Sequence, residues 1–184
     1  MLQGCETVAH IWGFYLHIRG IMRTLYLLRH AKSSWKDDSL RDFDRPLKGR
    51  GREAAEQIGK VLASEGLNSP LVISSPAVRA RETTQLVLQS AGVDVDPRFD
   101  ERIYEADVPA LLEVVSSIPD SASTAILVGH NPGFENLLSF LTGDDRHMPT
   151  CALARIEFDA ASWREVSEAS GRVESFITPK ELAE

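Results

Sequence analysis

Three short apolar runs, each followed at once by polar residues, constrain the fold of this chain most strongly. Each run is too short for a typical helix but long enough for a buried strand. We therefore expect strands at 25–28, 71–73 and 125–128. Apolar residues at helical spacing predict helices between and after these runs, at about 54–62, 77–90, 108–117 and 134–141. Strands and helices that alternate in this way predict an α/β fold, with helices flanking a mostly parallel central sheet.

Two glycines and two later apolar stretches complete the predicted order of elements. Gly66 and Gly92 each follow a predicted helix, at the position where glycine commonly ends one. The stretches 153–158 and 173–177 predict further strands, which we place at the later edge of the sheet. No repeat, low-complexity tract or linker interrupts residues 22–184, so we expect a single domain there.

Residues 1–21 differ from the rest and form an N-terminal extension of unknown role. The stretch 8–18 is apolar apart from two histidines, but it is too short to span a bilayer. No basic residue precedes Arg19, as one would in a secretory signal. Three explanations of this extension stay open: an upstream start site, a loosely attached extension, or a segment that contacts a membrane. For the domain itself we predict no membrane partner.

Composition and charge exclude several classes of protein. The chain has 184 residues, of which 43% are hydrophobic and 26% charged, so extensive disorder is not expected. The net charge of -7 argues against a dedicated nucleic-acid binder. Cys5 and Cys151 lie far apart without C-x-x-C spacing, which predicts two reduced thiols in a cytoplasmic protein. The oligomeric state is left open.

Polar residues follow all three of the predicted inner strands. Arg29 and His30 end the first strand, Arg79 lies in the helix turn after the second, and His130 follows the third. A lone histidine or arginine in such a place usually has a structural role. Ligands bind beyond the carboxyl ends of parallel strands, however, so we expect these two imidazoles and two guanidiniums to meet in one crevice.

This combination of side chains favours phosphate chemistry. Nearby guanidiniums lower the basicity of an imidazole, which makes it a poor general base. The same positive field holds a phosphoryl group against a neutral imidazole nitrogen, and arginine matches phosphate oxygens in a bidentate manner. Neither His30 nor His130 has a second ligand at i+2, i+3 or i+4, so we predict no metal site and no cofactor.

Five segments, in this order along the chain, resemble the sequence blocks of one enzyme family. They are Leu28–Trp35, Pro46–Gly51, Ser74–Thr83, Asp100–Arg102 and Val128–His130. The first is similar to an Arg-His-Gly signature, the third to a block with a phosphate-binding arginine, and the last to a Gly-His pair. Together they resemble the histidine phosphatase superfamily over nearly all of Met22–Phe158. The resemblance implies the three-layer phosphoglycerate mutase-like fold.

The resemblance also implies a role for each site residue. His30 would attack phosphorus and become phosphohistidine, while Arg29, Arg79 and His130 would bind and stabilise the transferring phosphoryl group. Glu101 lies where the family usually carries its proton donor, although a salt bridge to a neighbouring arginine is the alternative for this carboxylate.

Departures from the family pattern reduce the range of substrates that we expect. Ala31 replaces the usual glycine, Lys32 an acid, and Lys36 an asparagine of mutase-like members. The short spacing between Glu101 and His130 leaves room for one helix and for no long lid. An open site suits a phosphate carried by another protein, and this compactness resembles the small phosphohistidine phosphatases of the SixA type. We therefore predict a phosphohistidine-bearing protein as substrate and partner.

Two other functions and one charged cluster stay open. A phosphomonoesterase acting on a small metabolite or nucleotide would use the same residues, and a phosphate-binding module could retain them without turnover. Lys48, Arg50 and Arg52 lie near a predicted helix N-terminus, where the helix dipole disfavours cations. They could pair with acids of the loop 37–44, or they could form a docking surface for an acidic partner.

Overall fold

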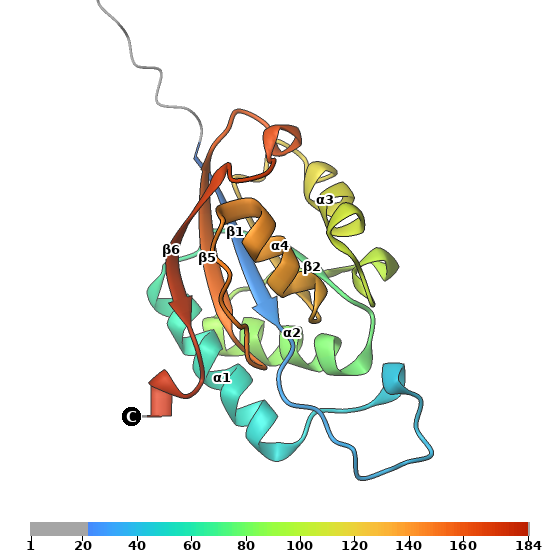
Figure 1. Cartoon of the computed structure of the whole chain (residues 1–184). Coiled ribbons are helices and arrows are strands. Elements are labelled where there is room, and N and C mark those ends of the chain that lie inside the picture. Colours follow the sequence, from blue (N-terminus) through green and yellow to red (C-terminus); the bar gives the residue numbers. More distant parts are fainter. Residues whose placement is uncertain (1–21, 184) are drawn as a thin grey trace, which may run out of the picture.

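The computed structural model describes residues 22–183 as a six-stranded sheet between two pairs of helices (Figure 1). The strands are β1 (Met22–Arg29), β2 (Leu71–Ser74), β3 (Arg98–Phe99), β4 (Thr124–Gly129), β5 (Leu153–Asp159) and β6 (Gly171–Ile177). Their order across the sheet is β3-β2-β4-β1-β5-β6. The predicted extension at residues 1–21 lies outside the described residues.

The sheet is parallel on one side and antiparallel on the other. Strands β3, β2, β4 and β1 run parallel, whereas β5 pairs antiparallel with both β1 and β6. The prediction of an α/β fold with a mostly parallel sheet is confirmed, and the two late strands do lie together at one edge. The two-residue strand β3 was not predicted, because it lacks the apolar run that marks the inner strands.

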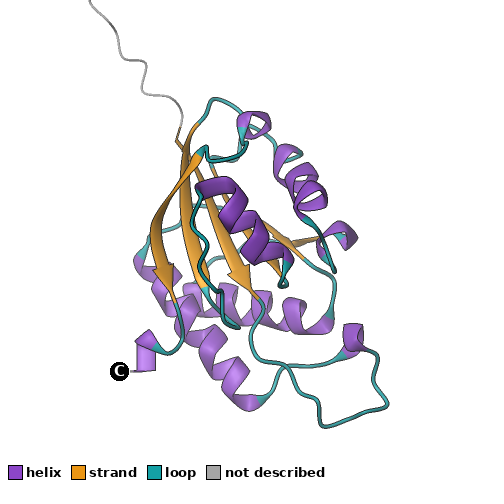
Figure 2. Cartoon of the chain, viewed as in Figure 1, coloured by secondary structure: helices purple, strands orange, loops and turns teal. Residues whose placement is uncertain are grey.

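In the described part of the chain, four α-helices cover the two faces of the sheet, as Figure 2 illustrates. They are α1 (Gly49–Ser64), α2 (Val78–Ala91), α3 (Val108–Ser116) and α4 (Gly133–Thr142). Helices α1 and α2 pack together on one face, and α3 and α4 on the other. As predicted, Gly92 ends α2 in the left-handed conformation, with φ of 66°.

Strand β1 is buried on both faces of the sheet, and its side chains belong to two hydrophobic cores, one on each face. Leu25 and Leu27 are fully buried against the α3–α4 layer. The alternate residues Tyr26 and Leu28 are buried in the α1–α2 layer. Side chains of a strand alternate between its faces, and a continuous apolar run is what a strand between two helical layers requires. Within residues 22–183, no helix is long and apolar enough to cross a bilayer.

Candidate active site

The carboxyl ends of β1, β4 and β2 lie side by side, and this places the candidate site. Arg29 at the end of β1 pairs in register with Gly129 at the end of β4. The next residue, His30, donates its backbone N–H to the Gly129 carbonyl at 2.9 Å. The backbone N–H of Ser75, just after β2, donates to the Val128 carbonyl at 2.9 Å. The polar residues that follow these three strands therefore meet at one edge of the sheet.

His30 is held in one tautomer. Its side chain is buried, and Nδ1 lies 2.7 Å from the carbonyl oxygen of Ala31. A carbonyl can only accept a hydrogen bond, so the proton resides on Nδ1 and the lone pair on Nε2. The guanidinium Nε of Arg79 donates to that Nε2 at 3.3 Å. The Nε2 lone pair of His30 thus points to the side of the site that carries Arg79.

The environment keeps His30 neutral. Burial lowers the pKa of His30 to about 4, against the opposing effect of its hydrogen bond to Ala31. The positive charges of Arg79, Arg29 and Arg45 lower this pKa further. An imidazole of this kind is uncharged near neutral pH and presents a nucleophilic nitrogen rather than a cation.

Two further arginines line the cavity beside His30. Arg29 donates from Nη1 to the Met148 carbonyl at 2.7 Å, and its Nε is buried without a hydrogen-bond partner among residues 22–183. Arg45 donates to the Ser33 hydroxyl at 2.6 Å and to the Ser34 carbonyl at 3.0 Å. The Arg29 guanidinium is held by a neutral oxygen, so its charge remains available to an anion, whereas Arg45 also has an acidic partner, Asp42.

His130 provides a second neutral imidazole. Its ring centroid lies 4.9 Å from that of His30, and its Nε2 lies 2.7 Å from the Ser75 hydroxyl. Burial, followed by the neighbouring His30 and Arg79, lowers the pKa of His130 to about 3. Its Nδ1 is buried and has no hydrogen-bond partner in the described part of the chain. A phosphoryl oxygen would satisfy this nitrogen if it carries the proton.

Asp42 organises the arginines, and the sequence did not indicate this role. Arg79 donates to the Asp42 carbonyl at 2.6 Å and to its carboxylate at 2.8 Å. The same carboxylate accepts from Arg45 at 2.5 Å and from the Tyr104 hydroxyl at 3.0 Å. Burial raises the pKa of Asp42, but these donors together outweigh it and hold the pKa below its usual value. The loop carrying Asp42 therefore sets the orientation of the Arg79 fork.

The site residues line two cavities that share Arg79. The smaller cavity, of about 250 Å³, is lined by Arg29, His30, Lys32, Ser33, Trp35, Arg45, Arg79 and Thr150. The larger, of about 530 Å³, includes Asp42, Glu105, His130 and Asn136 in its wall. The structure thus brings together four of the five residues singled out in the sequence: Arg29, His30, Arg79 and His130.

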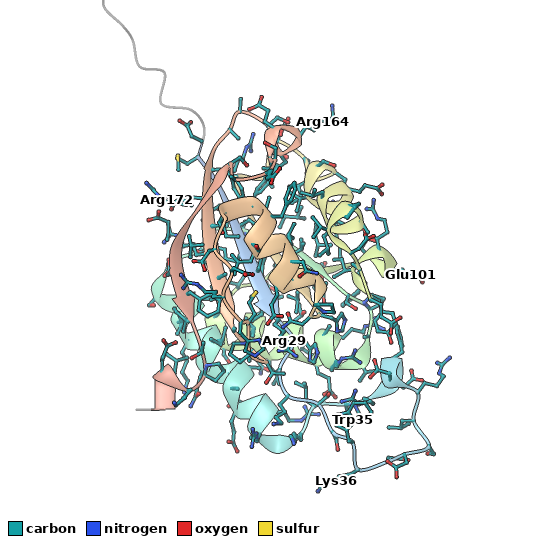
Figure 3. All side chains as sticks on the ribbon, viewed as in Figure 1. Arg29, Trp35, Lys36, Glu101, Arg164 and Arg172 are labelled. Atoms are coloured by element: carbon teal, nitrogen blue, oxygen red, sulfur yellow. The ribbon has the colours of Figure 1, made fainter. Side chains whose placement is uncertain are left out.

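The fifth residue, Glu101, does not join them. Its side chain is exposed, and Figure 3 shows it projecting outward at the margin of the molecule, away from Arg29. No ion pair involves Glu101 among residues 22–183, because Arg102 pairs with Asp100 and Glu113. Glu105, one short turn later, lines the larger cavity instead.

Glu105 also has an unusual backbone. Its φ is 52°, in the left-handed region that side chains other than glycine rarely adopt. Such strain is often retained at functional positions, and here it turns the chain into the pocket wall just before α3. Sequence spacing alone could not choose between two glutamates in one short segment.

The part of the chain described here has no group of three or more histidine, cysteine, aspartate or glutamate side chains that could hold a metal ion. The donors at the site are mostly guanidiniums, which repel cations and attract anions. The residues present therefore fit a phosphoryl group better than a metal.

Comparison with known proteins agrees with this geometry. The fold is the phosphoglycerate mutase-like α/β fold. The family model of the histidine phosphatase superfamily (branch 1) matches residues 25–113, and the chain belongs to this superfamily. Members of the superfamily are phosphatases or mutases. The matched range includes Arg29, His30 and Arg79 and ends before His130.

Three similar proteins illustrate the family. An uncharacterized chloroplastic protein of Arabidopsis thaliana is 34% identical over 86% of this chain and 79% of its own. A solved structure from Agrobacterium tumefaciens, named as a candidate phosphohistidine phosphatase SixA, is 30% identical with a TM-score of 0.72, over 85% of this chain and 98% of its own. A protein histidine phosphatase SixA complexed with tungstate has the same fold, with a TM-score of 0.75 at 18% identity, over 86% of this chain and 99% of its own.

Proposed function

We propose that this protein hydrolyses phosphohistidine on another protein through a covalent phosphohistidine formed at His30. The observation that carries the proposal is a buried, neutral imidazole whose Nε2 lone pair faces the guanidinium of Arg79. The similarity to structures named as SixA phosphohistidine phosphatases supports the substrate class.

In the first step, Nε2 of His30 attacks phosphorus in line with the leaving nitrogen of the substrate imidazole. A P–N bond to His30 forms as the substrate P–N bond breaks, and the electron pair of the broken bond returns to the substrate nitrogen, which takes up a proton from solvent. Arg29 and Arg79 bind the phosphoryl oxygens and stabilise their charge.

His130 acts in this step as a neutral hydrogen-bond donor. The Ser75 hydroxyl accepts from the Ala77 N–H at 3.3 Å, and in this proposal it donates its own hydrogen to Nε2 of His130 at 2.7 Å. The His130 proton then resides on Nδ1, the buried nitrogen without another partner. That N–H is available to a phosphoryl oxygen. In the second step water attacks phosphorus and loses a proton to solvent, the electron pair of the P–N bond returns to Nε2 of His30, and inorganic phosphate is released.

The leaving group explains why a phosphoramidate suits this site. Transfer from one imidazole to another exchanges two similar P–N bonds, so binding and positioning supply most of the rate. Between η2 (Glu101–Ile103) and β4 the chain has one regular helix, α3, and no long insertion to cover the site. A phosphate presented on the surface of a protein can therefore reach His30.

A substrate comparison tests the proposal directly. We expect kcat/KM for a phosphohistidine-bearing protein to exceed that for serine phosphate or glycerol phosphate by at least about 10²-fold, the contribution of a positioned acid that an alkoxide would need. A preference for the alkyl esters would instead identify a small-molecule phosphomonoesterase. Absence of turnover on every substrate would identify a binding module.

The proton donor is tested by two matched glutamate variants. We propose Glu105, which lines the larger cavity, as the residue that protonates leaving groups when they need it; Glu101, the sequence candidate, is the control. Glu105→Gln should reduce any alkyl ester hydrolysis by about 10²-fold or more and hardly change phosphohistidine turnover. Glu101→Gln should change neither. Loss of alkyl ester hydrolysis in Glu101→Gln, with no loss in Glu105→Gln, would identify Glu101 as the proton donor.

A further inference from the structure

Four cations lie near one another beside the smaller cavity. This basic patch consists of Lys32, Lys36, Lys48 and Arg50. Its two segments lie side by side, because the Lys48 N–H donates to the Lys32 carbonyl at 3.0 Å and Ser33 forms an antiparallel bridge with Leu47. Lys32 lines the cavity that contains His30, so the patch begins at the site itself.

In the described part of the chain, the acids of the neighbouring loop form no ion pair with the basic patch. Asp42 binds Arg79 and Arg45, and Asp44 binds Arg41. Of the cations grouped together in the sequence, Arg52 alone has an acidic partner, Glu82 at 2.9 Å. None of the four patch cations forms an ion pair within residues 22–183. Of the two interpretations of this cluster, pairing with the loop acids is therefore not what the structure shows.

The patch cations repel one another. Partial burial, and then repulsion from the other three patch cations, lower the pKa of the Lys48 ammonium. Lys48 and Arg50 also lie at the start of α1, where the helix dipole adds to this repulsion. Such a cluster of like charges is locally repulsive and attracts anions.

Trp35 adds an apolar contact beside the basic patch. Its side chain is 72% exposed, the most exposed of the large hydrophobic side chains in the described chain. The Arg45 guanidinium lies 3.2 Å from the centre of its ring and braces it. Figure 3 shows Trp35 and Lys36 on the loop that follows β1, at the same end of the molecule as Arg29. Tryptophan is among the residues enriched at the centres of protein-binding surfaces.

We propose that the basic patch and Trp35 form a docking surface for an acidic region next to the phosphohistidine of the partner protein. This inference rests on the proposed function and specifies the kind of protein that the site accepts. Complementary charge would orient the partner over His30, while the negative remainder of this protein would repel misoriented encounters. A small polyanion could bind the lysines, but it would gain nothing from Trp35, which is why we favour a protein.

Two phosphopeptides that differ only in charge test the docking surface. Each carries one phosphohistidine, flanked in one peptide by glutamates and in the other by glutamines at the same positions. Wild-type protein should cleave the glutamate peptide with a kcat/KM roughly tenfold higher at low salt. The preference should shrink between about 50 and 300 mM salt. Phosphoramidate serves as a substrate without flanking residues.

Charge reversal separates the patch from general electrostatics. Lys36→Glu combined with Lys48→Glu should abolish the preference for the glutamate peptide while keeping phosphoramidate hydrolysis within about twofold of wild type. The matched control is Arg164→Glu with Lys60→Glu, which makes the same change in net charge at exposed positions outside the patch. Figure 3 shows Arg164 at the opposite end of the molecule from Lys36. Trp35→Ala should raise KM for both peptides alike, because an indole contributes area rather than charge.

Each failure has a distinct meaning. Equal effects of the two double variants, or no peptide preference in wild type, would refute the docking surface and leave phosphohistidine hydrolysis intact. An effect on phosphoramidate as large as that on the glutamate peptide would show that the lysines bind small anions instead. A wild-type protein inactive on both peptides and on phosphoramidate would refute the proposed function and the docking surface with it.

Discussion

Lowering the pH should hardly impair His30 as a nucleophile until the solution is distinctly acidic. Burial and the charges of Arg79, Arg29 and Arg45 lower its pKa to about 4, below the ordinary value of 6.5. At about pH 5.5 an ordinary histidine is about 9% neutral, whereas a group with a pKa of about 4 is about 97% neutral. Phosphoryl transfer to His30 should therefore change little between about pH 7.5 and 5.5, where an ordinary histidine would lose about tenfold.

The same shift affects stability. The folded pKa lies below the unfolded one, so this contribution to stability is complete above about pH 6.5 and is lost as the pH falls through the window down to about 4. For His30 the loss reaches about 3 kcal/mol at about pH 4. His130, whose pKa is lowered to about 3, extends the window further into acid.

Titration of the imidazole proton resonances by NMR measures the pKa of His30, on which both the activity prediction and the stability prediction depend. The His30 resonance should stay at its neutral position to below about pH 5. Arg79→Met should raise the pKa of His30, yet keep it below 6.5, because burial is the larger cause. A pKa between about 6 and 7 in the wild-type protein would refute the electrostatic account of the nucleophile.

Three further outcomes follow from the geometry. Arg79→Lys should reduce turnover of phosphohistidine and alkyl esters alike by about 10²-fold or more, since lysine lacks the bidentate fork; a loss confined to one substrate would contradict this. Activity should survive exhaustive treatment with EDTA, and restoration by zinc or magnesium after a loss would favour a metal mechanism. Gly51→Ala should lower Tm by several degrees in thermal melts, because its Cβ would lie 2.2 Å from the Lys32 carbonyl oxygen, whereas Gly49→Ala meets nothing within 4 Å and should not.

The sequence predicted those parts of the fold that depend on local patterns. The apolar run of β1 and the glycine after α2 are strong signals, because a buried strand and a left-handed helix end each demand particular residues. The strand ends then predicted that His30 and His130 would be neighbours, and their rings lie 4.9 Å apart.

Contacts between distant loops could not be predicted in this way. Asp42 reaches Arg79 across 37 positions, and Tyr104 reaches Asp42 across 62. No periodicity encodes such pairs, since they depend on how two loops fold over the same sheet edge. The sequence indicated Glu101, whereas Glu105 lines the larger cavity, and the reason is the same. The turn at η2 and the left-handed φ of Glu105 decide which carboxylate enters the pocket.

The covalent intermediate is the central claim, and trapping it is the most direct test. A phosphohistidine peptide labelled on phosphorus is mixed with the protein and quenched in base within milliseconds, and the label is then located by mass spectrometry. The account predicts phosphate on His30 that survives base and is lost in acid, and His30→Ala should lose several orders of magnitude in turnover. Turnover without label on His30, or an alanine variant that keeps more than about one per cent of wild-type activity, would contradict the mechanism.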